Sequence, residues 1–283
     1  MARSIVTTLA AHVNKAEAER TRLKQPATLQ AHDYYLRAAD IDASLRSSFK
    51  TEDLYEIRHL LERALAIDPN YARAYSVLSC AYLWAWMFPC DSDYSNPLAL
   101  DRAHQLARKA VQMDPNLPQA RSHLGNALVW MRQHDAAIAE FEKAVALNPN
   151  FTDWRFGWAL LLAGEPARAI EVLNAHMRLD PFYPPNVPAL LGLVYYMLGH
   201  YADALPLFRE SSSRSPDYRG AHVFAAATYA QLGDLEKARA EADEVLRIEP
   251  SYTIEGTAKR IVVFKHAKDA DHFLEGLRKA GLT

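Results

Sequence analysis

Residues 125–149 read GNALVWMRQHDAAIAEFEKAVALNP, and this stretch decides the fold of the chain. A small residue, Gly125, lies in a first apolar segment, and the pair Ala137 and Phe141 lies four residues apart in a second. Pro149 closes the stretch. Apolar residues with helical spacing in two consecutive segments indicate two amphipathic helices. The stretch therefore predicts a helical hairpin that ends at a proline.

The closing proline recurs at a nearly constant interval. A proline preceded by a polar residue stands at six positions: Pro69, Pro115, Pro149, Pro181, Pro216 and Pro250. The successive intervals are 46, 34, 32, 35 and 34 residues, so four of the five lie within two residues of 34. An ordinary helical protein has the period of the helix alone, whereas a fixed longer period indicates a repeat array.

Three further positions of the repeat, here called columns, recur at the same interval as the closing proline. The small-residue position of the first helix is occupied by Gly125, Gly157 and Gly192, with Ser79 and Ala226 in the outer units. The Ala-x3-Phe pair of the second helix returns as Ala204 and Phe208 and, with leucine, as Ala169 and Leu173. Seven residues after the small-residue column stand Gly164, Gly199 and Gly233. A glycine there can end the first helix in a left-handed conformation.

Together these columns resemble those of the tetratricopeptide repeat, whose unit is a helix–turn–helix of 34 residues closed by proline. The resemblance implies an all-α protein of about fourteen helices, folded as a right-handed superhelical solenoid of stacked units with terminal capping helices. We expect five units at residues 71–115, 116–149, 150–181, 182–216 and 217–250. They are flanked by an amphipathic N-terminal helix (1–27), a degenerate first unit (28–70) and a C-terminal capping helix pair (251–283).

The long first interval reflects an irregular insertion at residues 87–97. Insertions of this size in a surface loop cost little free energy, although long loops are also frequent contact sites. Both interpretations of the insertion are open.

The composition of the chain argues against several classes of protein, namely nucleic-acid-binding, membrane and disulfide-rich proteins. The 32 basic and 34 acidic residues give a net charge of −2, which argues against a nucleic-acid partner. No apolar run is long enough to span a membrane, and the N-terminus lacks the pattern of a signal peptide. Two cysteines, Cys80 and Cys90, are too few for a disulfide framework. We therefore expect a cytoplasmic protein without a membrane partner.

No pattern typical of an enzyme is present in the sequence. It contains no Walker loop, dinucleotide fingerprint or nucleophile elbow. The eleven histidines include no His-Glu-x-x-His pair, and His176 in an alanine column is expected to be packed rather than to bind a metal. We predict no catalytic residues, no metal site, no cofactor and no enzyme activity.

The period also predicts which residues line the concave surface formed by the first helices. These candidates for partner binding are Arg73, Ser76, Cys80, Gln119, Ser122, Asn126, Trp154, Trp158, Leu193 and Tyr196. Aromatic residues in a groove are suited to anchoring a partner. For Trp154 and Trp158, the alternative is that both pack as core between helices. Only Asn126 fits the Lys, Asn and Arg set of repeats that grip a chaperone carboxylate, so that function is not expected.

Three stretches carry a closer resemblance: residues 30–37, 63–75 and 275–282. They resemble the C-terminal repeat region of bacterial class III adenylate/guanylate cyclases and of related repeat-bearing transcriptional regulators. A cyclase catalytic domain has no counterpart in this all-helical chain, so cyclase activity is not implied. The resemblance implies a bacterial, non-catalytic scaffold that binds a protein or peptide, in the regulatory region of a cyclase-like signalling protein. The alternatives are a homo-oligomer formed through the N-terminal helix, or an enzyme using the concave cavity.

Overall fold

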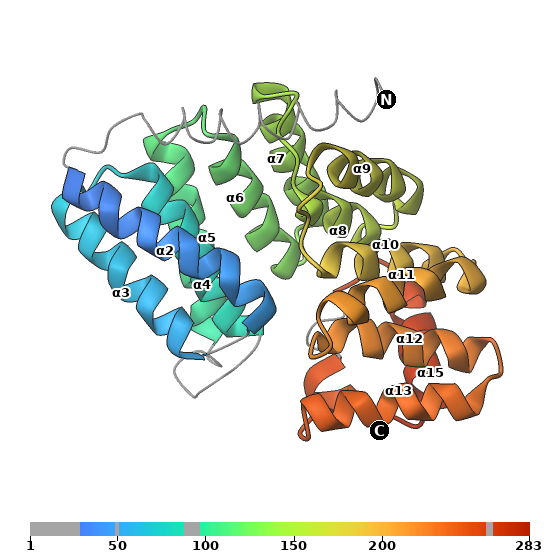
Figure 1. The fold of residues 1–283 in the computed structure, drawn as a ribbon. Helices are drawn as coiled ribbons and strands as arrows, with labels where there is room; N and C mark the ends of the chain where they lie inside the picture. The colour runs from blue at the N-terminus through green and yellow to red at the C-terminus, as the bar shows by residue number, and fades with distance from the viewer. Residues whose placement is uncertain (1–28, 49–50, 88–96, 259–262) are drawn as a thin grey trace, which may run out of the picture. The chain divides into compact units, whose positions relative to one another are not determined.

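The computed structural model describes residues 29–48, 51–87, 97–258 and 263–283 (Figure 1). Within these ranges the chain forms fourteen helical segments and no strand, so the all-α prediction is confirmed. The expected N-terminal helix at 1–27 and residues 88–96 of the insertion, which include Cys90, lie outside the described residues.

Helices alternate along the chain as first and second members of hairpins. The first helices are α2 (Leu29–Ser48), α4 (Ala72–Met87), α6 (Pro118–Trp130), α8 (Trp154–Leu162), α10 (Asn186–Met197) and α12 (Arg219–Gln231). The second helices are α3 (Thr51–Ile67), α5 (Pro97–Met113), α7 (His134–Leu147), α9 (Pro166–Leu179), α11 (Tyr201–Arg214) and α13 (Leu235–Ile248). One π-helical turn, η1 (Ile254–Ala258), and α15 (Ala267–Lys279) follow.

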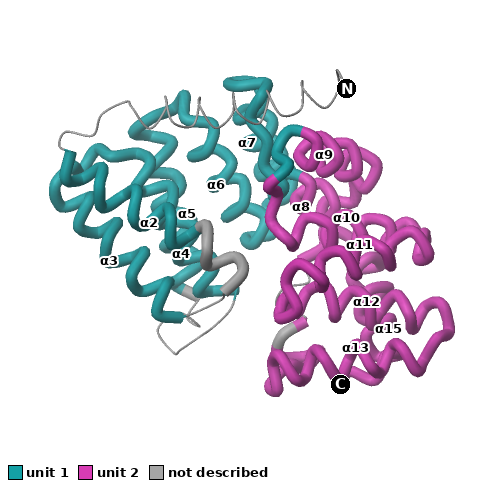
Figure 2. The backbone as a smooth tube through the Cα atoms, viewed as in Figure 1, with its two compact units in different colours: residues 1–156, 179–181 teal, residues 157–178, 182–283 magenta. Residues whose placement is uncertain are grey.

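The chain divides into two compact units (Figure 2). Unit 1 comprises residues 1–156 and 179–181, and unit 2 comprises residues 157–178 and 182–283. Within each unit the two helices of a hairpin pack on each other, and first helices of successive hairpins also touch, as α4 touches α6 and α10 touches α12. We call the side of the first helices that is turned away from the second helices the inner face.

The small-residue column and the large-residue column meet inside each hairpin. Gly125 lies against Phe141, Gly157 against Leu173 and Gly192 against Phe208. A Cβ added at Gly157 or Gly192 would come 2.5 Å from its partner, so something would have to shift. The repeated glycines are therefore contact points at which the first helix approaches the second.

The exit from the first helix is left-handed, as the sequence predicts. Gly164, Gly199 and Gly233 have φ angles of 87°, 78° and 80°. In the hairpin of α6 and α7 the same position holds Arg132, with φ of 60°. Its backbone bonds match those of the glycine hairpins, because Arg132 N donates to Val129 O at 2.9 Å as Gly199 N does to Tyr196 O at 2.9 Å.

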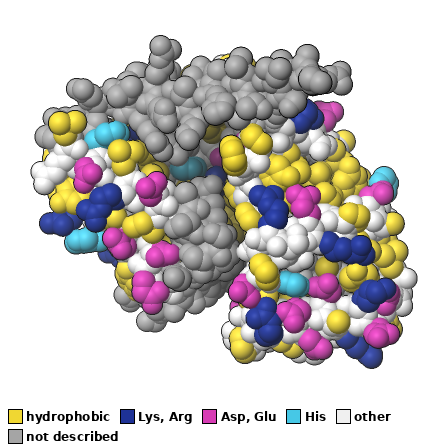
Figure 3. Space-filling model, viewed as in Figure 1, with side chains coloured by type: hydrophobic (Ala, Val, Ile, Leu, Met, Phe, Trp, Pro, Cys, Tyr) yellow, Lys and Arg dark blue, Asp and Glu magenta, His cyan; other side chains and the backbone are white. Residues whose placement is uncertain are grey.

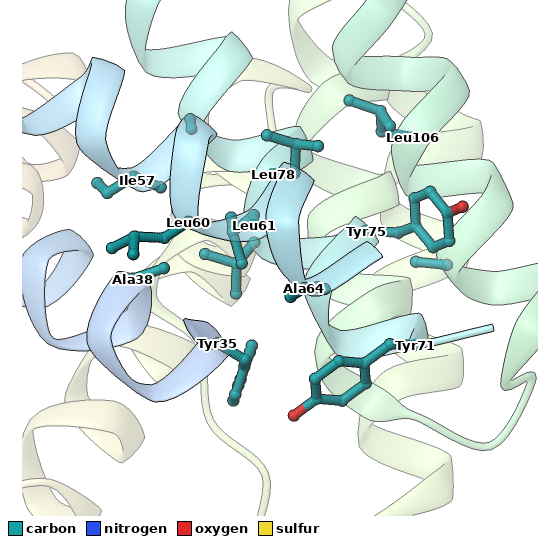
Figure 4. Packing of buried hydrophobic residues seen from close by; sticks show 14 of the residues in the cluster. Tyr35, Ala38, Ile57, Leu60, Leu61, Ala64, Tyr71, Tyr75, Leu78 and Leu106 are labelled. Carbon is teal, nitrogen blue, oxygen red and sulfur yellow. The ribbon is translucent and has the colours of Figure 1, made fainter. Parts of the chain in front are cut away.

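A continuous apolar core joins the first hairpins of unit 1 (Figure 4). Tyr35 of α2, Leu61 of α3 and Leu78 of α4 are all at most 5% exposed within it. The Tyr35 and Tyr71 rings lie 5.2 Å apart between centroids. Residues 29–67 thus pack as a helical hairpin against the next one, although their sequence follows the repeat pattern only weakly.

Candidate functional site

A buried ion pair lies at the start of α8 in unit 1. Asp153 accepts hydrogen bonds from the Arg155 amide at 3.0 Å, from Arg155 Nη1 at 3.1 Å and from Ser122 Oγ of α6. The two charged side chains are 8% and 6% exposed. Burial by itself would raise the pKa of Asp153, but the Arg155 charge and the Ser122 hydrogen bond lower it to about 2. The pair therefore stays ionised and ties α8 to α6.

A second polar contact joins α4 to α6. His123 Nδ1 lies 2.8 Å from Ser76 Oγ and 3.0 Å from the Ser76 carbonyl oxygen. Burial, together with the nearby Arg155 charge, lowers the pKa of His123 to about 4. His123 is therefore neutral at physiological pH and acts as a structural hydrogen-bonding group.

These two contacts belong to one buried cluster, the inner polar network. Its members are Asp42, Ser76, Cys80, Ser122, His123, Asp153 and Arg155. Burial disfavours the charged form of Arg155, but the Asp153 carboxylate, together with that of Asp42, raises the pKa of its guanidinium above the ordinary value. Arg155 Nη2 is buried without a hydrogen-bond partner. The network thus adds polar contacts between α4, α6 and the start of α8 to the apolar core of unit 1.

The inner-face candidates of unit 1 fall into two groups. Ser76, Cys80, Ser122 and Asn126 are at most 8% exposed, and the first three belong to the inner polar network. Arg73 and Gln119 are partly exposed. An aromatic contact between Trp86 and Trp130, with ring centroids 5.8 Å apart, lies between the C-terminal ends of α4 and α6.

Trp154 and Trp158 are both half-buried. They belong to different compact units, because the boundary between the units falls after Phe156. The guanidinium of Arg155 lies over the Trp154 ring, 4.9 Å from its centroid, and Trp154 Nε1 is buried without a hydrogen-bond partner. Trp154 therefore combines a packed ring with an unused donor.

Two further inner-face candidates of unit 2, Leu193 and Tyr196, are covered. Leu193 is 2% exposed and Tyr196 is completely buried. The C-terminal helix α15 lies against Tyr196, whose ring stacks on His272 with centroids 4.9 Å apart. The surface that the repeat pattern marks for a partner therefore contacts a helix of the same chain.

The described residues show neither a metal centre nor a membrane segment. No group of three or more His, Cys, Asp or Glu side chains in these ranges could hold a metal ion. None of the described helices has the length and the apolar character that crossing a membrane requires.

A family model described as Tetratricopeptide repeat matches residues 99–155 and 195–254. The chain contains tetratricopeptide repeats. The matched ranges include α6, α7, α12 and α13, where the small residues and the left-handed helix exits recur. Of the first helices that carry the candidate residues, α6 lies entirely within a matched range.

Curated relatives share part of this repeat region. The transcriptional regulator HilA of Salmonella typhimurium is 29% identical over 164 residues, which are 57% of this chain and 29% of HilA. Putative adenylate cyclase 3 of Rhizobium meliloti is 32% identical over 135 residues, 48% of this chain and 22% of the relative. The chain thus spans less than a third of the length of these relatives.

Among solved structures, the Cut9–Hcn1 hetero-tetramer of the APC/C matches 98% of this chain and 52% of its own, with a TM-score of 0.62. At 16% identity the match shows the tetratricopeptide fold alone.

The repeat register located the inner helices but missed three of the residues that hold them together. His123 and Arg155 each follow a candidate position by one residue, and Asp153 precedes the helix. One signal was available in the sequence. Arg155 is the only charged residue between Trp154 and Gly164, and a lone charge in an apolar helix indicates a buried pair.

Proposed function

We propose that this chain is a non-catalytic scaffold that binds a protein or peptide partner through the inner helices of its tetratricopeptide units. The family supports interaction with other polypeptides in general terms. The similarity to a transcriptional regulator and to a putative adenylate cyclase, each much longer than the matched segment, supports a place in the regulatory region of a larger signalling protein.

One observation carries the proposal: aromatic and polar side chains of the inner helices keep partial exposure. They are Arg73, Gln119, Trp154 and Trp158. Tryptophan and arginine are enriched among the residues that dominate interface energies.

The surface charge fits a polypeptide partner better than a polyanion. Figure 3 shows Lys and Arg side chains interspersed with Asp and Glu over the visible face of unit 2, without a large patch of one sign. A nucleic-acid partner would favour a basic patch.

The test uses peptides selected from a random library on the wild-type chain. Trp154→Ala and Trp158→Ala are then compared for peptide affinity and for melting temperature. We expect a loss of about 2 kcal/mol in binding, roughly thirtyfold, for whichever tryptophan contacts the peptide. Phe182→Ala is the matched control, because Phe182 is 86% exposed outside the first helices. Unchanged affinity, or a collapsed melting transition in both variants, would identify the tryptophans as core.

A further inference from the structure

Helix α15 occupies the inner face of unit 2. It packs mainly on α12, with further contacts to α10 and η1, and it also touches the first residue of α11, where the Tyr201 hydroxyl lies 3.3 Å from His272 Nε2. Figure 1 shows α15 beside α12. A helix that only closed the array would stack on both helices of the last hairpin. Because most of its packing is on the first helix α12, with a further contact to α10, α15 lies where a tetratricopeptide array presents its inner surface.

The contact is that of an amphipathic helix in a groove. Phe273, Leu274 and Leu277 of α15 are at most 6% exposed. The Phe273 ring packs edge-on against Tyr196 of α10 and Phe224 of α12, with centroids 5.9 and 5.8 Å away. The exposed charged side chains on the other side are Lys268, Asp271, Glu275 and Arg278, whereas Lys279 Nζ donates to Gln231 Oε1 of α12 at 3.2 Å. This face of unit 2 thus binds a stripe of aromatic and aliphatic side chains along one side of α15.

A small residue sets how closely α15 approaches. A Cβ added at Gly276 would overlap the Tyr196 hydroxyl and lie 3.1 Å from Ala227 Cβ. The hydroxyl donates to the His272 carbonyl oxygen at 3.2 Å and accepts from Gln231 Nε2 at 3.4 Å. The face therefore selects a helix in which a glycine follows the aromatic residue by three positions.

The segment before α15 is anchored separately. The Lys265 amide donates to the Leu162 carbonyl oxygen at 2.7 Å, and the His266 ring lies against Gly164. Helix α15 begins directly afterwards, at Ala267. An isolated helix of 13 residues is marginal in water, so α15 depends on the face it covers, whereas α10 to α13 pack on one another without it.

We propose that α15 is the resident ligand of this face, and that the face binds an amphipathic helix of a partner protein in exchange for it. The partner helix presents an aromatic residue, an aliphatic residue, a small residue and an aliphatic residue at the positions of Phe273, Leu274, Gly276 and Leu277. This inference rests on the proposed scaffold function and names the class of its partner. Release of α15, with the hinge at His266, is the step that opens the face.

The probe is a fluorescein-labelled synthetic peptide of residues 266–283. The wild-type chain should bind it weakly, because the attached α15 competes at an effective concentration near millimolar. Gly276→Trp in the full chain should expel α15 and strengthen peptide binding at least tenfold. Arg278→Trp is the matched control, since it places the same side chain on the exposed side of α15 and should leave binding weak. A probe peptide that carries Gly276→Trp should not bind.

The proposal is overturned if the folded Gly276→Trp chain binds the probe no better than wild type. Hydrogen exchange on the wild-type chain gives a second measurement if that variant fails to fold. Amides of α15 should then exchange at least tenfold faster than those of α12, and exchange of both helices in one cooperative unit overturns the proposal. The library peptides sensitive to Trp154 or Trp158 test the scaffold function separately, because a failure of one experiment leaves the other unaffected.

Discussion

At the scale of single residues, Arg132 occupies a position that three later hairpins give to glycine. Its φ of 60° is left-handed, and such a conformation costs a residue with a Cβ about 1–2 kcal/mol. The side chain is exposed, so its removal loses little packing. We expect Arg132→Gly to stabilise the protein by about 1 kcal/mol, measured as a higher midpoint in chemical denaturation.

The reverse substitution provides the control. At Gly199, with φ of 78°, an added Cβ would meet nothing within 4 Å. Gly199→Ala therefore tests backbone strain without overpacking, and it should destabilise by a similar amount. Opposite signs for the two substitutions would assign the effect to the left-handed exit. Destabilisation by both would show instead that the Arg132 side chain contributes to packing.

At the scale of elements, one polar contact recurs between the two helices of a hairpin. In α12 and α13, His222 Nδ1 lies 2.7 Å from Glu241 and His222 Nε2 lies 3.0 Å from the Pro216 carbonyl oxygen. In α6 and α7 the equivalent contact is made by Arg121, which donates to Glu140 at 2.9 Å and to the Pro115 carbonyl oxygen at 3.0 Å. The same architecture thus uses a permanent cation in one unit and a titratable one in the other.

The His222 contact should depend on pH. The hydrogen bond to Glu241 raises the pKa of His222 in the folded protein above 6.5. Its contribution to stability is therefore complete below about pH 6.5 and is lost as pH rises through the folded-state pKa. We expect His222→Arg to add about 0.5 kcal/mol to the unfolding free energy at pH 8.5 and little at pH 5.5. With Glu241→Gln in the background, this gain should disappear.

At the scale of the whole molecule, the two compact units should differ in their response to acid. The pKa of His123 in unit 1 is about 4, below its ordinary value of 6.5, because burial disfavours the charged form and Arg155 opposes it. Unit 1 therefore loses stability as pH falls from about 6.5 towards 4, while Asp153, with a pKa of about 2, stays ionised. In unit 2, the His222 contact is fully formed over the same range.

Tryptophan fluorescence measures this difference, since Trp84, Trp86, Trp130 and Trp154 belong to unit 1 and only Trp158 to unit 2. Between pH 7 and pH 5, the denaturation midpoint followed by fluorescence should fall. His123→Gln should flatten this dependence, because the amide keeps a hydrogen-bonding group at Ser76 without binding a proton. An equally steep pH dependence in the variant would exclude His123 as the cause.

The repeat register predicted more of the fold than of the site. Contacts such as Gly192 with Phe208 recur every 34 residues or so, and their period is visible in the sequence. The pair of Asp153 and Arg155 occurs once, so no period reveals it. The position of α15 depends on the close fit of Gly276 to Tyr196, two residues far apart in sequence. Features that repeat were therefore predictable, whereas features that single out one surface were not.

The meeting of Gly125 with Phe141, and its counterparts in two later hairpins, lies within each hairpin and not between hairpins. The left-handed exit is local to the same hairpin. Each module thus carries its own internal fit, and duplication or deletion of one complete module leaves the fit of every other intact. The inner face can accordingly become longer or shorter by one complete hairpin at a time during evolution. An insertion or deletion of one residue inside a hairpin, in contrast, would disrupt both its glycine contact and its left-handed exit.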